Sequence, residues 1–392
     1  MTDDLLARHP EVVVPTEPSA RRRRPVRWLA VPLSIYAASR VVQLALIAWL
    51  LPPDGTTVND RLMQWDAGWY VEVARHGYPH RYSYGPDGQL VGNGLAFLPG
   101  YPLLVRVVHE ITRLDYRTAT LLAAFLAGAG AAVAVYALGA HLYDARVGAC
   151  LAALFCAQPM SAALSMAYSE GLFVAFAAGA LLAGFRRAWL TAGGLGLAAA
   201  LTRPTGAAVA VALALAAVMA LRAGERPRWR PIAAALVALA ALPAYLAWVG
   251  LRVGTWHAWF DIQTAGWGST FDGGSATVSF VTRALRGSDE WVAVSVALLV
   301  IASVVAAVVA LTTRVWPPLV AYGLLALVLV LGQGGYYHSK PRLLVPVFTL
   351  LVPAAVVLGR ARARTAVPVL VGWAAFGLWY GAYLITVWRY AI

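Results

Sequence analysis

Asp66 stands beside an apolar stripe whose spacing predicts a helix. Leu62, Trp65, Trp69 and Val73 recur every three or four residues, and the two tryptophans suit a helix that lies in the membrane interface. A carboxylate that is partly desolvated at a lipid boundary accepts protons more readily, which would let Asp66 take a proton from a hydroxyl group. The alternative is a solvated loop acid next to tryptophan anchors.

Glu170 is a second acidic residue in an apolar setting, at the start of the apolar run 169–185. In a structural role, Ser169 would cap this helix at its N-terminus and the helix dipole would favour Glu170. In a functional role, Glu170 would line a polar cavity at the outer mouth of a membrane domain, because ionisable groups within membranes are costly and usually functional. The sequence leaves both interpretations open.

Four basic or potentially basic residues could hold a phosphate group. Arg203 lies in a Pro-Gly break between two short apolar runs, where it either faces lipid headgroups or serves a site. His338, Lys340 and Arg342 follow one another closely and could offer a phosphate a protonated imidazole, a point charge and a bidentate fork. A contact with lipid headgroups is the alternative for this cluster.

No metal or nucleotide motif is present in the sequence. His76 and His80 are four residues apart, but Gly77 and Pro79 would break a helix that presented both to one metal. There is no Gly-x-x-x-x-Gly-Lys loop and no Gly-x-Gly-x-x-Gly turn. We therefore expect no cofactor and no metal site, while a requirement for a divalent ion is left open. A substrate that reacts outside the membrane would have to arrive already activated, and a lipid-linked phosphosugar fits that requirement.

The composition excludes a soluble enzyme. The chain has 392 residues, of which 60% are hydrophobic and 12% charged, as expected of an integral membrane protein. Its net charge of +13 comes almost wholly from arginine, since Lys340 is the only lysine. The arginine clusters alternate with the apolar runs as the positive-inside rule requires, so the excess indicates orientation and not nucleic-acid binding. We expect a multi-pass protein of the cell (plasma) membrane.

Eleven apolar runs, separated by charged residues, proline or glycine, predict an all-α polytopic fold. Ahead of them we expect a disordered cytoplasmic tail over 1–27, followed by one transmembrane domain over 28–392. Two large loops, 52–116 and 252–290, and the short segment 333–342 then lie outside. The predicted spans are near 28–51, 117–139, 147–163, 169–185, 189–202, 205–221, 232–251, 291–311, 317–332, 343–358 and 367–388.

Four motifs follow one another along the chain, and they are Trp65-Asp66-Ala67-Gly68-Trp69-Tyr70, Ala96-Phe97-Leu98-Pro99-Gly100-Tyr101-Pro102, Ser169-Glu170-Gly171-Leu172-Phe173 and Leu201-Thr202-Arg203-Pro204-Thr205-Gly206. In type and order they resemble the PIG-V-type mannosyltransferases, over about residues 30 to 350. That family has eukaryotic and bacterial members within the GT-C superfamily of polytopic glycosyltransferases. Leu98 and Gly100 stand where the family often has two large aromatic residues.

The resemblance implies a GT-C-type glycosyltransferase fold of about eleven transmembrane helices, with interfacial helices in the first outer loop. It also implies a polyprenyl-phosphate-mannose donor and Asp66 as the catalytic base, with Trp65 and Tyr70 of the same motif at the substrate. We therefore expect a hexosyltransferase that transfers mannose to an extracytoplasmic lipid, glycan or protein and inverts the anomeric configuration. Its partners would be the lipid-linked donor, the acceptor and membrane lipids, with no nucleic acid.

This reaction needs a base and cations but no acid catalyst. A sugar phosphodiester leaves as a weakly basic phosphate, so only its developing charge must be stabilised. Arg342, Lys340 and His338 are expected to stabilise it, with Arg203 as a further candidate. Glu170 would orient the acceptor or hold the charged groups beside it in place.

Two alternatives remain at this point. A flippase or transporter would bind a lipid-linked saccharide without chemistry, and its first outer loop would be dispensable. The length of 52–116 and the absence of sequence repeats disfavour a transporter. A noncatalytic membrane scaffold would not require Asp66, Glu170, Arg203 and Arg342 to converge.

Overall fold

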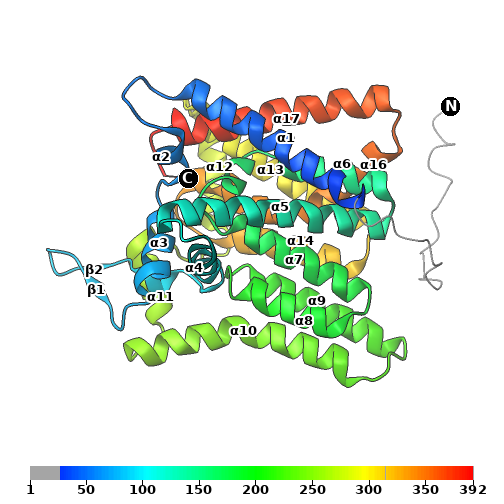
Figure 1. Ribbon diagram of the computed structural model, residues 1–392, viewed down its shortest axis with the longest axis horizontal. Helices are drawn as coiled ribbons and strands as arrows, with labels where there is room; N and C mark the ends of the chain where they lie inside the picture. The colour runs from blue at the N-terminus through cyan, green and yellow to red at the C-terminus, as the bar shows by residue number, and fades with distance from the viewer. Residues whose placement is uncertain (1–26, 314, 392) are drawn as a thin grey trace.

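The computed structural model describes residues 27–313 and 315–391, and its main elements are helices (Figure 1). The tail expected over 1–27 lies outside the described residues, except for the backbone of Arg27. One small antiparallel hairpin, in which Ser83–Tyr84 (β1) pairs with Leu90–Val91 (β2), adds two short strands to the all-α fold that the sequence predicts.

The helices differ widely in length. The longest are α1 (Arg27–Leu50), α5 (Tyr116–Leu142), α10 (Trp229–Val253), α13 (Trp291–Thr312) and α17 (Ala363–Thr386). Helices of intermediate length are α4 (Gly100–Thr112), α6 (Ala145–Cys156), α7 (Glu170–Phe185), α8 (Trp189–Ala200), α9 (Gly206–Arg222), α12 (Ser275–Gly287) and α14 (Pro317–Gly332). The short ones are α2 (Val58–Leu62), α3 (Ala67–His76), α11 (Ala258–Trp267), α15 (Lys340–Leu343) and α16 (Val352–Arg360), with 3-10 turns η2 (Gly94–Ala96), η3 (Ser161–Leu164), η4 (Tyr337–Ser339) and η5 (Val345–Leu351).

The protein is a multi-pass membrane protein, but eleven full spans are not confirmed. Each predicted run contains a helix, yet within the described residues five helices are long and apolar enough to cross a membrane. A sixth crossing is formed if Tyr337–Leu343 and Val345–Arg360, which bend by 59° at a short break, are taken together. Five other apolar helices have 10–17 residues, short of the roughly 20 that a hydrocarbon core requires.

One predicted span, 147–163, ends early. Helix α6 stops at Cys156, and a buried irregular segment with η3 at its centre leads to α7. Pro159 has no N–H for a helical bond, and Met160 is left-handed at φ 63°. The buried Arg40 of α1 supports this segment, donating to the carbonyls of Ser161 at 2.6 Å and Cys156 at 2.7 Å. Irregular backbone is tolerated at membrane depth where protein groups satisfy it in this way.

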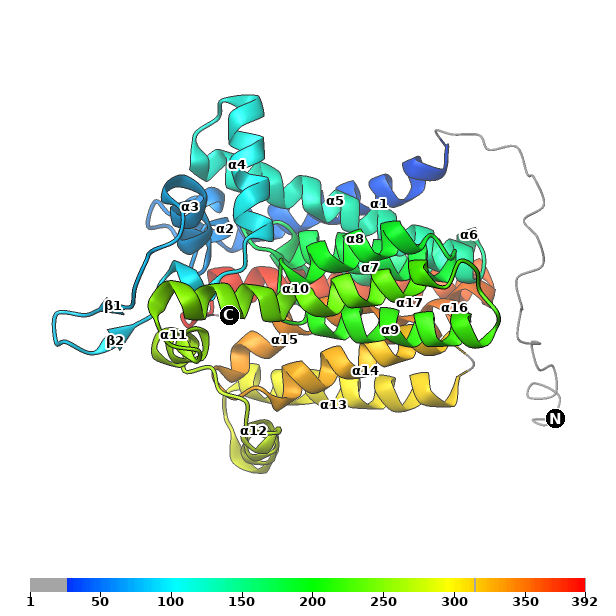
Figure 2. The same cartoon turned by 90° about the horizontal axis from the view of Figure 1, so that it is seen from below.

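The first outer loop folds onto one end of the helical bundle. Figures 1 and 2 both place α2, α3, α11 and the β-hairpin at this end, which we call the loop end. The predicted continuous helix through Trp65 is wrong: α2 ends at Leu62, Trp65 is left-handed at φ 56°, and α3 begins at Ala67. Leu62 and Val73 are nevertheless both buried. The break separates α2 from α3 and leaves Asp66 at the N-cap position of α3.

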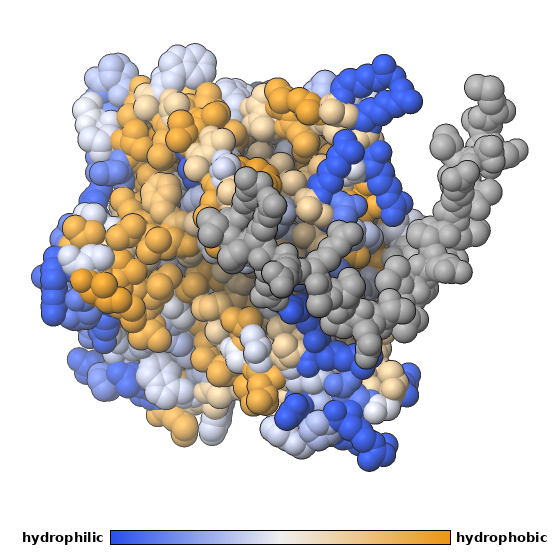
Figure 3. Space-filling model, turned by 45° about the vertical axis from the view of Figure 1, so that its right-hand side comes forward, coloured by the Kyte–Doolittle hydropathy of each residue, from blue (hydrophilic) through white to orange (hydrophobic). Residues whose placement is uncertain are grey.

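Two glycines let helices approach closely near the motifs. A Cβ atom on Gly171 would lie 2.9 Å from the backbone nitrogen of Gly128, so α7 packs directly on α5. A Cβ atom on Gly100 would lie 2.3 Å from Thr202 Oγ1, and the N–H of Gly100 donates to the carbonyl of Leu201 at 2.8 Å. The second contact joins α4 to the turn that carries Arg203. On the face shown in Figure 3, hydrophobic side chains cover most of the surface and hydrophilic ones gather at its edges, as suits a surface in lipid.

Candidate active site

Asp66 is held by residues from two distant parts of the chain. It occupies the N-cap position of α3, but its side chain makes no capping hydrogen bond. Instead, Arg342 Nη1 donates to Oδ2 at 2.8 Å and Trp267 Nε1 donates to Oδ1 at 3.2 Å. The backbone N–H of Asp66 donates to the Tyr168 hydroxyl at 3.4 Å. The carboxylate therefore faces away from its own helix, with both oxygens in contact with donors from outside the first loop.

Glu170 connects the two arginines. Its Oε1 lies 2.9 Å from Arg203 Nη1 and 3.8 Å from Arg342 Nε, and its side chain is fully buried. These contacts are ion pairs, because neither oxygen of Glu170 has a partner with hydrogen-bond geometry. Asp66, Glu170, Arg203 and Arg342 thus form one cluster of two acids and two bases, with a formal charge of zero. A buried carboxylate without such partners would be strongly destabilising.

Ser169 joins Tyr70 to the same cluster. Its Oγ accepts from Arg203 Nη1 at 3.0 Å and shares a hydrogen bond of 2.9 Å with the Tyr70 hydroxyl. Ser169 occupies the N-cap position of α7 but its side chain makes no capping hydrogen bond, so the structural interpretation of Ser169 as a capping side chain is wrong. Burial raises the pKa of Tyr70, which therefore stays a neutral phenol beside these charges.

Three side chains of the cluster are partly exposed. The side chains of Asp66, Arg203 and Arg342 are 18%, 14% and 12% exposed, in contrast to Glu170. A small group such as a hydroxyl or a phosphate oxygen can therefore reach the two arginines and the Asp66 carboxylate.

Two side chains that contact this cluster were not predicted from the sequence. Trp267 ends α11 in the second outer loop and belongs to an aromatic group beside Asp66, with its ring centroid 5.2 Å from Phe97 and 5.9 Å from Trp69. Tyr168 lies under Arg342, whose guanidinium carbon is 4.7 Å from the ring centroid, a cation–π distance. Position next to Ser169 was a signal for Tyr168, whereas no spacing in 252–290 distinguished Trp267.

The other two predicted cations lie elsewhere. Lys340 Nζ donates to the carbonyl of Val330 at 2.7 Å and to that of Gln333. His338 is buried against the aromatic rings of Tyr336 and Tyr390. The expected three-cation phosphate cluster is therefore not assembled in the structure, and Arg342 alone reaches Asp66. Helical geometry accounts for Lys340, which is two residues from Arg342 in α15 and so points to another side of the helix. His338 lies in the separate 3-10 turn η4 that precedes α15.

Trp65 contributes through the backbone. Its left-handed conformation lies between α2 and α3 and directly precedes Asp66, while its half-buried ring packs on the main core. Within residues 27–313 and 315–391, no three His, Cys, Asp or Glu side chains are grouped so that they could hold a metal ion. The convergence of Asp66, Glu170, Arg203 and Arg342 argues against a scaffold, which would not need it.

The fold is of the GT-C type. It is similar to ArnT from Cupriavidus metallidurans bound to undecaprenyl phosphate, with a TM-score of 0.54 and 18% identity over 90% of this chain and 64% of that one. The apo state of the same protein gives a TM-score of 0.53 and 19% identity over 86% and 61% of the two chains. The chain thus covers less than two thirds of ArnT.

Part of the chain is homologous to a mannosyltransferase. It is 33% identical to GPI alpha-1,6-mannosyltransferase 2 of Mus musculus over 122 residues, which are 29% of this chain and 22% of the mouse protein. The protein of the same name from Homo sapiens gives the same identity and coverage. The match therefore spans less than a quarter of the mammalian proteins. No protein-family model matches the chain.

Proposed function

We propose that the chain is an inverting glycosyltransferase that moves mannose from polyprenyl-phosphate-mannose to a hydroxyl group of an acceptor. The observation that carries this proposal is the contact of Asp66 with Arg342, which places a candidate base beside a candidate phosphate ligand. The partial homology to a mannosyltransferase supports the sugar, and the undecaprenyl phosphate bound to ArnT supports a polyprenyl carrier.

Asp66 acts as the general base. The acceptor hydroxyl donates its proton to the carboxylate while its oxygen bonds to the anomeric carbon, from the face opposite the phosphate. The bond between the anomeric carbon and the phosphate oxygen breaks, and its electron pair leaves with the phosphate. Inversion of configuration follows from this single displacement.

Arg342 and Arg203 bind the donor phosphate. A planar guanidinium suits phosphate oxygens, and the two arginines are held on either side of Glu170. When a phosphate binds to Arg342, the guanidinium donates to the phosphate and no longer to Asp66, which leaves Oδ2 of Asp66 free to accept the acceptor proton. Donor binding thereby activates the base. The two arginines then stabilise the charge on the departing phosphate, so the reaction needs no resident cofactor and no acid catalyst.

The aromatic group beside Asp66 binds the sugar. Trp69, Phe97 and Trp267 offer ring faces next to the carboxylate, and Trp267 also fixes its orientation through Nε1. We propose that the loop end faces the outside of the plasma membrane, with the N-terminus in the cytoplasm, as the arginine pattern indicates. The acceptor is then a lipid, glycan or protein outside the cell.

A transfer assay tests the proposal. Membranes containing the chain are supplied with polyprenyl-phosphate-mannose labelled in the sugar, and labelled acceptor is collected and its anomeric configuration determined. We expect transfer with inversion, and its loss in Arg342→Gln. The control is Arg283→Gln, which removes an exposed arginine from α12 and should retain activity. If the chain moves the labelled lipid across the membrane and produces no labelled acceptor, it is a flippase and the proposal is wrong.

A further inference from the structure

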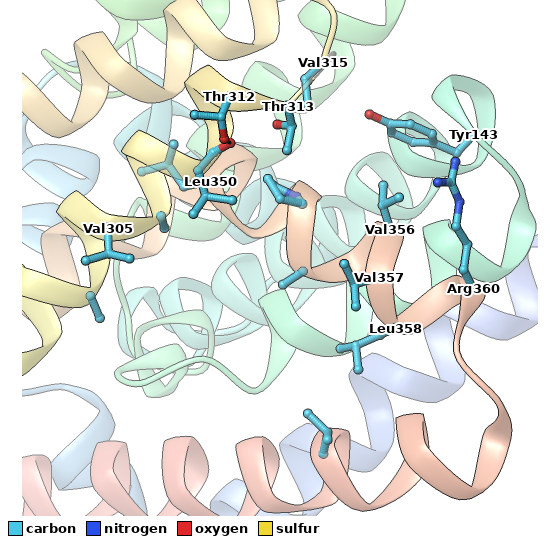
Figure 4. Close-up of a pocket in the computed structure, with 16 residues that line it drawn as sticks. Tyr143, Val305, Thr312, Thr313, Val315, Leu350, Val356, Val357, Leu358 and Arg360 are labelled. Carbon is cyan, nitrogen blue, oxygen red and sulfur yellow. Dashed lines mark hydrogen bonds between the residues drawn. The ribbon is translucent and has the colours of Figure 1, made fainter. Parts of the chain in front are cut away.

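A large apolar cavity lies far from the candidate active site. Its volume is about 1030 Å³, and it is bounded by the second half of α13, by α16 along its length and by the first turns of α17 (Figure 4). Arg342 stands at the beginning of the bent helix pair that ends in α16, whereas Arg360 flanks the cavity at the end of that pair. Figure 2 shows α15 toward the loop end and α16 at the opposite end. The cavity is thus distinct from the site around Asp66.

The walls of the cavity open onto the lipid-facing flank. Val305 and Val309 of α13, Val357 of α16 and Val369 of α17 line the cavity and are exposed. Because a bilayer contains no free water at this depth, a cavity of this size is filled by hydrocarbon chains. Apolar walls do not select among lipids, since all lipid tails are equally apolar. Selection must come from polar groups at the rim.

The rim is basic. Arg360 lines the cavity, with its guanidinium on the side of Tyr143 (Figure 4). Arg362 follows in the turn between α16 and α17, and Arg364 lies in the first turn of α17. All three arginines are exposed, and none of them forms an ion pair within the described residues. Arg146 lies at the same place, because its Nη2 donates to the carbonyl of Ala361 at 2.7 Å.

A nearby acid forms no ion pair with this rim among the described residues. Asp144 is the acidic residue closest in sequence to Arg146, and its Oδ1 accepts from the backbone N–H groups of Arg146 and Val147 at 2.8 Å and 2.9 Å. It therefore caps α6. The arginines at the mouth of the cavity remain available for an anion.

We infer that this cavity binds one anionic phospholipid in the leaflet opposite the active site, with an acyl chain between α13 and α16 and the phosphate on Arg360, Arg362 and Arg364. Charge complementarity identifies the occupant, since an apolar channel that ends in unpaired arginines matches a lipid tail with an anionic headgroup. The bound lipid packs between α13 and the helix pair that carries Arg342. The lipid thereby stabilises the position of this helix pair without contacting the active site.

Native mass spectrometry of the full chain tests this inference. The purified protein is equilibrated with equimolar dioleoyl phosphatidylglycerol and dioleoyl phosphatidylcholine in mixed micelles, and the lipids retained are counted. We expect one tightly retained phosphatidylglycerol. The variant R360Q/R362Q/R364Q should lower the ratio of retained phosphatidylglycerol to phosphatidylcholine at least about tenfold, the effect expected of three arginines near an anionic headgroup. The control R222Q/R226Q/R228Q removes three exposed arginines next to α9 and α10 and should leave the ratio unchanged.

A second variant separates the cavity from the charges. Ala302→Phe and Ala354→Phe place rings in the cavity from exposed wall positions, so the core is not disturbed. We expect this double variant to lose the retained lipid although all the arginines are present. Equal retention of both lipids by the unaltered protein, or retention unchanged in both the charge and the cavity variants, would overturn the inference. The readout is bound lipid, so its result is independent of whether the chain transfers mannose.

Discussion

The charge balance of the active-site cluster gives a sharp test by a double-mutant cycle at Glu170 and Arg203. The cluster holds two acids and two arginines, so its formal charge is zero. Glu170→Gln leaves one acid and two arginines, with a formal charge of +1, and Arg203→Gln leaves two acids and one arginine, with a formal charge of −1. The double variant returns to neutrality. We therefore expect the double substitution to lower the free energy of unfolding by less than the sum of the losses caused by the two single substitutions.

The burial of the pair sets the size of the effect. Glu170 is fully buried and Arg203 is 14% exposed, at a distance of 2.9 Å. Removing one partner of a buried pair costs about 3–5 kcal/mol, because the remaining charge is uncompensated. Each single variant should lie at the lower end, about 3 kcal/mol, since Arg342 also contacts Glu170. The double variant should then be less destabilised than the sum of the two by about 2 kcal/mol, within the range measured for residues in one network.

The assay measures the free energy of unfolding of the purified chain in detergent, with unfolding induced by denaturant titration or by heat. The control pair is Glu110 and Arg113, whose side chains are 56% and 77% exposed at 2.6 Å. Its cycle should give no more than about 0.5 kcal/mol. If the free-energy costs at Glu170 and Arg203 simply add, the two residues are not an ion pair and the cluster is not the unit that we describe.

Three further predictions follow from named contacts. Trp267→Phe removes the N–H that orients Asp66 and should slow transfer about tenfold, since a hydrogen bond to a charged group is worth roughly 1.5–3 kcal/mol. Trp256→Phe, at an exposed position, should not change the rate. Equal transfer rates in the two variants would show that Trp267 is not part of the site. Gly100→Ala places a Cβ atom 2.3 Å from Thr202 Oγ1 and should cost about 1–3 kcal/mol of unfolding free energy, whereas Gly194→Ala, with no atom within 4 Å, should not destabilise, and a silent Gly100→Ala would contradict the packing of α4. Finally, transfer should persist after dialysis against EDTA, because arginines bind the phosphate in our proposal; loss of activity restored by magnesium would contradict that role.

Hydropathy alone predicts where helices form. All eleven predicted runs contain a helix, because a long apolar segment in a membrane is stable as a helix. The breaks could not be predicted from local pattern. Helix α6 ends before a segment that depends on Arg40, which is 116 and 121 residues away from the carbonyls it contacts. The left-handed turn at Trp65 interrupts a stripe whose spacing is perfectly helical.

The site was predictable in part for a similar reason. Asp66 and Arg342 are 276 residues apart, and no periodicity relates them. The ordered motifs indicated Asp66, Glu170 and Arg203. Arg342 was predicted only because its guanidinium group suits a phosphate. The prediction from charge alone included Lys340 in the phosphate cluster, but Lys340 instead donates to backbone carbonyls. A contact that depends on one ring nitrogen, such as that of Trp267, becomes visible only when the two outer loops are folded together.

The rate of mannose transfer by Asp66→Asn tests the central claim most directly. Asn keeps the size of the side chain and its contact with Trp267 but cannot accept the proton. Measured with labelled polyprenyl-phosphate-mannose beside the loop variant Asp87→Asn, the rate should fall by roughly 10²–10⁴-fold in Asp66→Asn and stay unchanged in Asp87→Asn. An Asp66→Asn protein that transfers mannose at the full rate would show that Asp66 is not the base.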